Sequence, residues 1–222
     1  MVHRADGEHQ RRERDVLSGD APADVDPHAE LVGALRVLAD AATRTLVGPE
    51  RMREAALTAR ALAADLAAEL HPTPWRPRPP GAAATFSQHA NPLLPELAVD
   101  WAGERLVGRA RLLPSYGGPP GLVHGGILAL MFDQVLGMLL HGVGRPSLTA
   151  NLSVDYLAGT PLETDLELVG EVTETAGRRS TAVVTIGPPG TVTARATGTM
   201  VTVRPVGPDG RVSMSAAGGV SA

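Results

Sequence analysis

The chain has 222 residues, enough to bury the core of one main domain with an appendage, and its net charge is −4. Basic residues do not outnumber acidic ones, which argues against a large nucleic-acid surface, and we expect no nucleic-acid partner. The sequence contains no cysteine. Disulfides, thiolate metal sites and a cysteine nucleophile are therefore excluded, and we expect a cytoplasmic protein.

The N-terminal part divides into three segments by composition. Residues 1–26 are charged and poor in hydrophobic residues, so we expect them to be disordered. Residues 27–70 predict a helical hairpin, because leucines recur at helical spacing and Gly48-Pro49 separates two helices, with Pro49 placed to begin the second. We interpret the hairpin as an element for packing or dimerisation. The prolines of residues 71–89 predict a stiff, extended linker.

Residues 90–205 combine strand patterns with one apolar helix. Ala102-Gly103 marks a turn between two strands, at residues 97–101 and 105–113. The helix is predicted at about residues 123–141, and four more strands follow at residues 148–157, 165–175, 179–186 and 192–203. This order predicts an α+β fold in which an antiparallel sheet wraps around a long central helix. Residues 206–222 are rich in Gly, Ser and Ala, and we expect a disordered tail.

The apolar run within this helix covers residues 127–140 and is interrupted by Asp133, Gln134 and Gly137. It is shorter and more polar than the roughly 20 apolar residues that cross a bilayer. We therefore expect no stable membrane insertion.

The start of the predicted helix places His124 before two glycines, Gly125 and Gly126. Glycines let a ligand approach the backbone, and the first N–H groups of a helix have no partner within it. The helix dipole adds partial positive charge at the same place. Fixed N–H donors of this kind can stabilise a developing oxyanion.

Nine residues after His124, Asp133 stands among apolar neighbours. A buried carboxylate needs a partner or a function, whereas a solvent-facing or hydrogen-bonded aspartate needs neither, and the spacing leaves both interpretations open. At about 1.5 Å per residue, Asp133 lies roughly 13 Å along the helix axis from His124. No single substrate atom can touch both. If both act on it, a second copy of the helix must supply one of them, which indicates a two-fold dimer.

Together these residues resemble a known family. His124-Gly125-Gly126 with Asp133, the strand Leu148-Thr149-Ala150-Asn151-Leu152 and the later Gly177-Arg178-Arg179 are similar to the hotdog-fold thioesterases. The resemblance covers about residues 90–204 and is closest to the branch of the PaaI-like phenylacetyl-CoA thioesterases and the human Them family. It implies hydrolysis of an acyl-CoA by a homodimer or dimer of dimers. It implies no metal and no cofactor, since coenzyme A is part of the substrate.

The resemblance also implies roles for individual residues. Asp133 would act as general base or as nucleophile, and Thr149 would orient the water or the aspartate. The N–H of Gly125 would bind the thioester carbonyl, and His124 would help shape that site. The remaining implied substrate-binding residues are Gly126, Asn151, Arg178 and Arg179, the two arginines facing the nucleotide end of coenzyme A.

Some features leave alternatives open. A turn carrying two solvated arginines would explain Arg178 and Arg179 equally well. Some relatives carry an Asn or Gln shortly before the His-Gly-Gly motif, where this chain has residues 116–121 without either, and Asn91 and Gln88 are candidate substitutes. With two Phe, two Tyr and two Trp, the acyl pocket is expected to be aliphatic and to favour an aliphatic acyl group. The alternative functions are a hotdog acyl-CoA hydratase or dehydratase, and a non-catalytic acyl-CoA binding protein.

Overall fold

The computed structural model describes residues 26–70 and 91–203. The expected disordered segments at residues 1–26 and 206–222 and the expected linker at residues 71–89 thus lie, apart from Asp26, outside the described residues. The two N-terminal helices are α2 (Pro27–Arg44) and α3 (Pro49–Leu66), followed by a short 3-10 helix η1 (Ala67–Glu69). The boundary predicted at Gly48-Pro49 is confirmed, because Pro49 is the first residue of α3.

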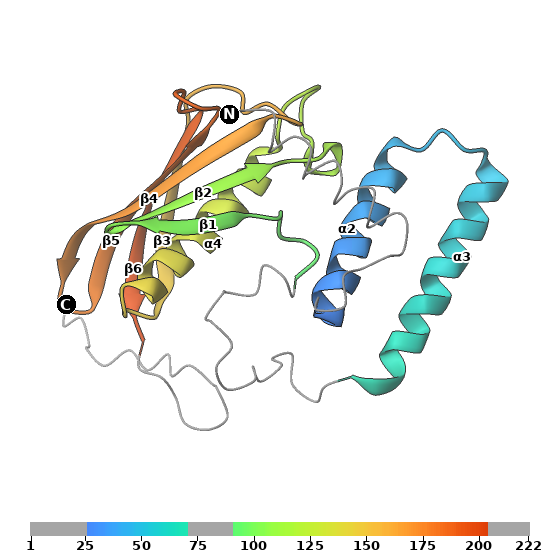
Figure 1. Ribbon diagram of the computed structural model, residues 1–222, viewed down its shortest axis with the longest axis horizontal. Helices are drawn as coiled ribbons and strands as arrows, with labels where there is room; N and C mark the ends of the chain where they lie inside the picture. Colours follow the sequence, from blue (N-terminus) through green and yellow to red (C-terminus); the bar gives the residue numbers. More distant parts are fainter. Residues whose placement is uncertain (1–25, 71–90, 204–222) are drawn as a thin grey trace, which may run out of the picture.

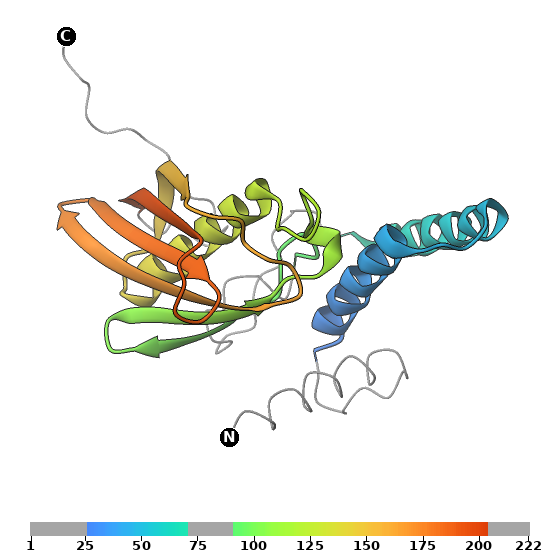
Figure 2. The same cartoon turned by 90° about the horizontal axis from the view of Figure 1, so that it is seen from above.

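Six antiparallel strands form one sheet in the order β1-β2-β4-β5-β6-β3. Their bounds are β1 (Ala98–Ala102), β2 (Arg105–Arg111), β3 (Ser147–Tyr156), β4 (Asp165–Ala176), β5 (Arg179–Gly187) and β6 (Ala194–Thr202). A 3-10 turn, η2 (Pro114–Tyr116), and the long helix α4 (Gly125–Gly142) separate β2 from β3. The sheet curves around α4, so the predicted antiparallel sheet on a central helix is confirmed (Figures 1 and 2).

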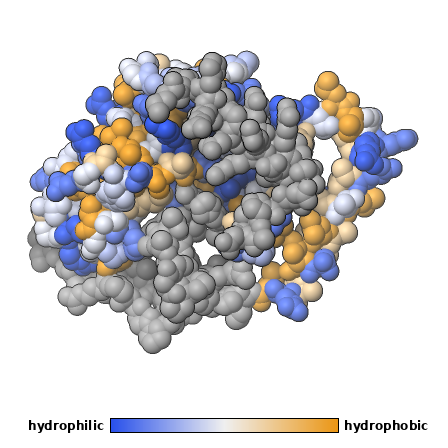
Figure 3. All heavy atoms as spheres, viewed as in Figure 1, coloured by the Kyte–Doolittle hydropathy of each residue, from blue (hydrophilic) through white to orange (hydrophobic). Residues whose placement is uncertain are grey.

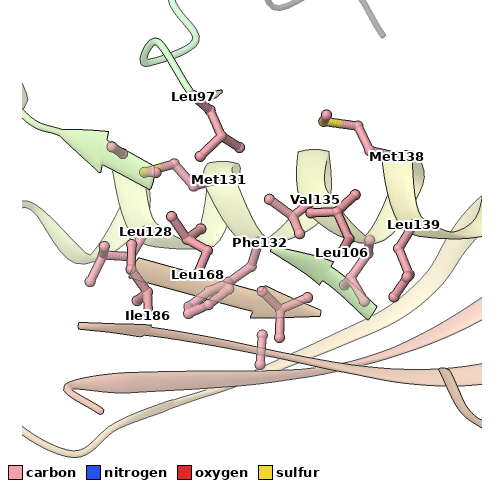
Figure 4. Close-up of a cluster of buried hydrophobic side chains, with 14 of the residues drawn as sticks. Leu97, Leu106, Leu128, Met131, Phe132, Val135, Met138, Leu139, Leu168 and Ile186 are labelled. Carbon is pink, nitrogen blue, oxygen red and sulfur yellow. The ribbon is translucent and has the colours of Figure 1, made fainter. Parts of the chain in front are cut away.

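The core lies between α4 and the concave face of the sheet. Phe132, Val135 and Leu139 of α4 belong to one cluster of buried side chains with Leu168 of the sheet (Figure 4). Gly198 of β6 allows this close approach, since a Cβ at that position would lie 2.5 Å from a Leu136 methyl carbon. By length and composition α4 could also cross a membrane. Its packing inside the sheet accounts for the same apolar composition.

The two N-terminal helices differ in their contacts. Asp26 caps α2 by accepting a hydrogen bond from the N–H of His28, and α2 buries Val32 and Asp40 where it packs against η2. No residue of α3 is buried. Its apolar side chains remain exposed beside charged ones on the helical side of the molecule (Figure 3).

Candidate active site

The N-terminus of α4 is organised by His124, which is the N-cap residue of the helix. Its Nδ1 accepts a hydrogen bond from the N–H of Gly126 at 2.9 Å, so the ring proton of a neutral imidazole lies on Nε2. The backbone N–H of His124 donates to the carbonyl of Tyr116 at 2.9 Å. The N–H of Gly126 is therefore already used within the protein, which argues against the direct substrate contact predicted for it.

Gly125 is the residue whose backbone lies open. Within residues 26–70 and 91–203, no acceptor pairs with its N–H, as expected for the first residue of a helix. Its carbonyl accepts a hydrogen bond from the Tyr156 hydroxyl at 2.8 Å. A Cβ on Gly125 would lie 3.3 Å from the Tyr156 ring. Glycine thus lets Tyr156 of β3 lie directly against the helix start while the N–H stays available.

Asp133 lies two turns further along α4 and is exposed in the single chain. Its Oδ1 accepts a hydrogen bond from the Thr149 hydroxyl of β3 at 2.7 Å. Of the two interpretations left open, the single chain fits the exposed, hydrogen-bonded aspartate: the apolar neighbours of Asp133 in sequence belong mostly to the buried faces of the helix. The predicted pair of Asp133 and Thr149 is nevertheless brought together, with Oδ2 left free to accept a proton.

A β-bulge explains how Thr149 reaches Asp133. The pairing of β3 with β6 shifts between Thr149 and Asn151, so that Ala150 is an extra residue. Thr149 pairs with the buried Met200, on the face of the sheet that covers α4. If Ala150 were included in a regular ladder, Thr149 and Tyr156, seven residues apart, would point to opposite faces, so the bulge is what lets both point toward α4.

Asn151 and the two arginines lie at different places around this pair. Asn151 pairs with Thr199 and so lies on the face of β3 that points away from α4, apart from Asp133. Arg178 and Arg179 lie at the β4–β5 turn and are exposed, and the Nε of Arg178 donates to the Thr202 carbonyl at 3.2 Å. Ser180, Met200 and Thr149 are paired in one row across β5, β6 and β3. Arg178 and Arg179 directly precede Ser180, so both arginines lie at the same end of the sheet as Thr149 and its partner Asp133.

The two candidate centres are far apart in one chain. Tyr156 marks the Gly125 centre and Thr149 marks the Asp133 centre, and the seven residue steps between them along β3 span on the order of 20 Å. β3 is also an edge strand of the sheet. Two surface hollows, on α3 and on the outer face of β1, β2 and β4, include none of the predicted site residues. The chain therefore keeps its two candidate centres apart, both beside the edge strand β3.

Two tyrosines at the Gly125 centre were missed by the sequence analysis. Tyr156 is the last residue of β3, the strand that carries the motif of residues 148–152. Its place at the end of that strand was the signal that could have pointed to the helix start. Tyr116 occupies the place where some relatives carry Asn or Gln, and its carbonyl holds His124. The proposed substitute Asn91 uses its side-chain oxygen to accept from the N–H of Leu93, and Gln88 lies outside the described residues. Among the residues described, no three His, Asp or Glu side chains gather as a metal site.

Comparisons with known proteins agree with this architecture. The family model described as Thioesterase superfamily matches residues 120–195. One solved thioesterase superfamily protein is 27% identical, with a TM-score of 0.70, and the match covers 82% of this chain and 93% of that one. A thioesterase superfamily protein from Shewanella loihica PV-4 is 29% identical, with a TM-score of 0.43 and coverages of 49% and 91%. A hypothetical thioesterase from Streptococcus pneumoniae TIGR4, solved with coenzyme A, is 24% identical, with a TM-score of 0.46 and coverages of 48% and 88%.

The first of these matches also reaches the N-terminal helices. Residues 91–222 make up only about three-fifths of the chain, so a match over 82% extends into the part that precedes the sheet. The family model, in contrast, begins at residue 120. The likeness to that solved protein therefore extends into the helical part of the chain that precedes the sheet.

Proposed function

We propose that this chain hydrolyses an acyl-CoA, with an aliphatic acyl group, to a carboxylic acid and coenzyme A, and the match of residues 120–195 to the Thioesterase superfamily model supports the proposal. The observation that carries the proposal is the pair of half-sites. One is the carboxylate of Asp133 with the Thr149 hydroxyl 2.7 Å away, and the other is the open N–H of Gly125. A base and an oxyanion donor are the two groups that hydrolysis of a thioester requires. The motif resemblance favours the PaaI-like and Them-like branch.

The chemistry follows from these two groups. Thr149 donates to Oδ1 of Asp133 and leaves Oδ2 to take a proton from water, and the water oxygen attacks the thioester carbon. The N–H of Gly125 then donates to the oxyanion of the tetrahedral intermediate, with the Nε2–H of His124 as a neighbouring donor. Collapse of the intermediate breaks the carbon–sulfur bond and releases the CoA thiolate, which takes up a proton. Direct attack by Asp133, giving an anhydride that water then cleaves, uses the same residues.

A dimer through β3 supplies a complete site. Antiparallel pairing of two β3 edges about a two-fold axis between Leu152 and Ser153 would place Thr149 opposite the partner subunit's Tyr156. Asp133 of one protomer would then face the Gly125 end of the other, and the dimer would contain two such sites. The exposed edge of β3 and the exposure of Thr149 and Tyr156 in the single chain support this arrangement.

The exposed arginines suit the nucleotide end of the substrate. Arg178 and Arg179 lie at the end of the sheet that holds Asp133. Guanidinium groups bind phosphates with two parallel hydrogen bonds, so an acyl-CoA approaching Asp133 would find phosphate ligands on the same side. This favours acyl-CoA over thioesters that lack charged phosphates.

The decisive experiment is a thioesterase assay with acyl-CoAs of increasing chain length, in which release of free CoA is the readout. The matched control is Asp133→Asn, which keeps the size and the hydrogen bond to Thr149 but removes the base. We expect the control to fold and to lose about 10²- to 10⁴-fold in kcat. A variant that keeps more than half of the wild-type kcat would remove Asp133 from the mechanism. Binding of acyl-CoA without hydrolysis by the wild type would favour a binding protein, and addition of water to an enoyl-CoA would favour a hydratase.

A further inference from the structure

The turn that holds His124 is itself held by the N-terminal helix α2. Tyr116, the last residue of η2, accepts the N–H of His124 through its carbonyl at 2.9 Å, and its neighbour Gly117 forms a β-bridge with Val123. The start of α4 is thus attached to η2 at two successive points. Any shift of η2 would move the N–H of Gly125, the next residue after His124.

Two residues of α2 connect that helix to η2. The buried carboxylate of Asp40, which is 4% exposed, accepts a hydrogen bond from the backbone N–H of Ser115 at 3.3 Å and pairs with Arg44. Arg36 hydrogen-bonds the hydroxyl of Tyr116. A buried carboxylate carries a desolvation penalty that is offset only by fixed partners, so the Asp40 contact defines one docking position for α2.

Arg36 also joins η2 to the chain that enters β1. Its Nε donates to the Leu94 carbonyl at 2.9 Å, and its guanidinium donates to the Asn91 carbonyl at 3.1 Å. One planar guanidinium therefore holds two backbone carbonyls and a phenol at once, a geometry that a lysine ammonium does not reproduce. Burial raises the pKa of Tyr116, against the opposing effect of the Arg36 charge and hydrogen bond, so the phenol stays neutral in this contact at working pH.

We propose that Arg36 and Asp40 of α2 are positioning residues for the Gly125 N–H, acting through η2 and His124. The inference rests on the proposed function, in which that N–H binds the oxyanion. A preformed donor is effective only if it is fixed, and a displacement of about 1 Å can reduce turnover by about 100-fold. Both residues lie in the helical segment that precedes the sheet, outside residues 120–195 that the family model matches.

The test is Arg36→Ala, with Arg36→Lys as the variant that keeps the charge and Arg60→Ala as the matched control. Arg60 is an exposed arginine of α3, the helix without buried residues. We expect Arg36→Ala to lower kcat about 10- to 100-fold with KM changed less than about twofold. Arg36→Lys should not restore kcat, and Arg60→Ala should match the wild type. Asp40→Asn, which keeps an acceptor for the N–H of Ser115, should recover most of the kcat that Asp40→Ala loses.

A double-mutant cycle separates positioning from general loosening of the fold. In a Gly125→Pro background, which deletes the N–H, Arg36→Ala should cause no further loss, whereas in an Asp133→Asn background its full effect should persist. Equal additional losses in both backgrounds would overturn the proposal, as would an unchanged kcat in folded Arg36→Ala and Asp40→Ala.

Hydrogen exchange distinguishes failure of this inference from failure of the proposed function. The amide of His124, held by Tyr116, should exchange faster in Arg36→Ala than in the wild type, whether or not the protein cleaves thioesters. An inactive wild type with faster exchange in the variant would reject the thioesterase function but keep the mechanical link. An active wild type with unchanged exchange and unchanged kcat in the variant would reject the link alone.

Discussion

The stretch of α4 from Gly125 to Asp133 presents functional groups of different kinds at its two ends. At the Gly125 end the group is a backbone N–H, fixed by His124 and η2, and at the Asp133 end it is a carboxylate met by the hydroxyl of Thr149. A backbone donor tolerates many side-chain changes nearby but depends on everything that positions the turn. A side-chain pair depends on its own chemistry and on the register of one strand. We therefore expect mutations at many positions to weaken the Gly125 group, and mutations at only a few positions to weaken the Asp133 group.

The largest effect is expected when the two ends are inactivated in different protomers. Asp133→Asn and Gly125→Pro should each be nearly inactive alone. The proline is compatible with the first position of a helix, and His124, with ψ of 130°, already has the extended conformation that precedes a proline. In a random mixture, half of the dimers are mixed and each holds one intact site of two, so activity should return to about a quarter of wild type.

This mixture must be made by co-expression or co-refolding, with mixed dimers confirmed by mass. Gly125→Ala is the control for the added Cβ, which would lie 3.3 Å from the Tyr156 ring, since alanine keeps the N–H. If confirmed mixed dimers of folded subunits stay as inactive as their parents, the two ends do not share a site.

A smaller effect is expected from Thr149, because it orients the base and is not the base itself. Thr149→Ala should reduce kcat about 10-fold, the value of one hydrogen bond to a charged group, and Thr149→Ser should be close to wild type. Steady-state kinetics on the same acyl-CoA give both values. Equal losses in the two variants would assign the effect to packing of the threonine methyl group and not to its hydroxyl.

The arginines test whether the Asp133 end also binds the nucleotide. Arg178→Ala with Arg179→Ala should raise KM for acyl-CoA by roughly fivefold, the scale of exposed ion pairs, and leave kcat unchanged. A short thioester without a nucleotide is the control substrate and should be unaffected. Because Arg178 also donates to the Thr202 carbonyl, Arg179→Ala alone is the cleaner variant. An equal loss on both substrates would show that the pair has a structural role.

The smallest effect concerns stability at alkaline pH, and it belongs to the Gly125 end. Burial raises the pKa of Tyr116, so its neutral phenol contributes stability that is complete below the unfolded pKa of about 10 and is lost as pH rises through the folded value. The chain has no lysine, no cysteine and only two tyrosines, so few side chains titrate there. The free energy of unfolding should therefore fall above about pH 10, and less so in Tyr116→Phe. The same slope in both proteins would contradict this.

The sequence was sufficient for the fold because its signals were local. Turn residues and alternating apolar positions located all six strands within a few residues, and Pro49 located the start of α3. The family motif brought Asp133 and Thr149 together correctly, and the structure places these two side chains 2.7 Å apart. Asn151 lies on the opposite face because the bulge at Ala150 breaks the alternation, and nothing in the residue types there marks a bulge.

The contacts that join distant segments could not be predicted. The hydrogen bond from Ser115 to Asp40 joins residues 75 positions apart, and the helical pattern of α2 shows only that Asp40 is on a helix. A periodic pattern also fails to distinguish α2 from α3, since both are 18-residue helices that begin with proline, yet only α2 has buried residues. Which helix docks is decided by a few polar contacts, and those depend on the position of η2.

The bulge at Ala150 decides which face of β3 carries Thr149. Thr149 and Tyr156 are separated by seven residue steps, an odd number, so regular alternation would turn one of them away from α4, and the bulge lets both face the helix. A substitution that favoured a regular strand at this point would therefore turn the hydroxyl away from Asp133 without changing the hydroxyl itself. Deletion of Ala150 would remove the bulge and the odd step together, so both side chains should keep facing α4.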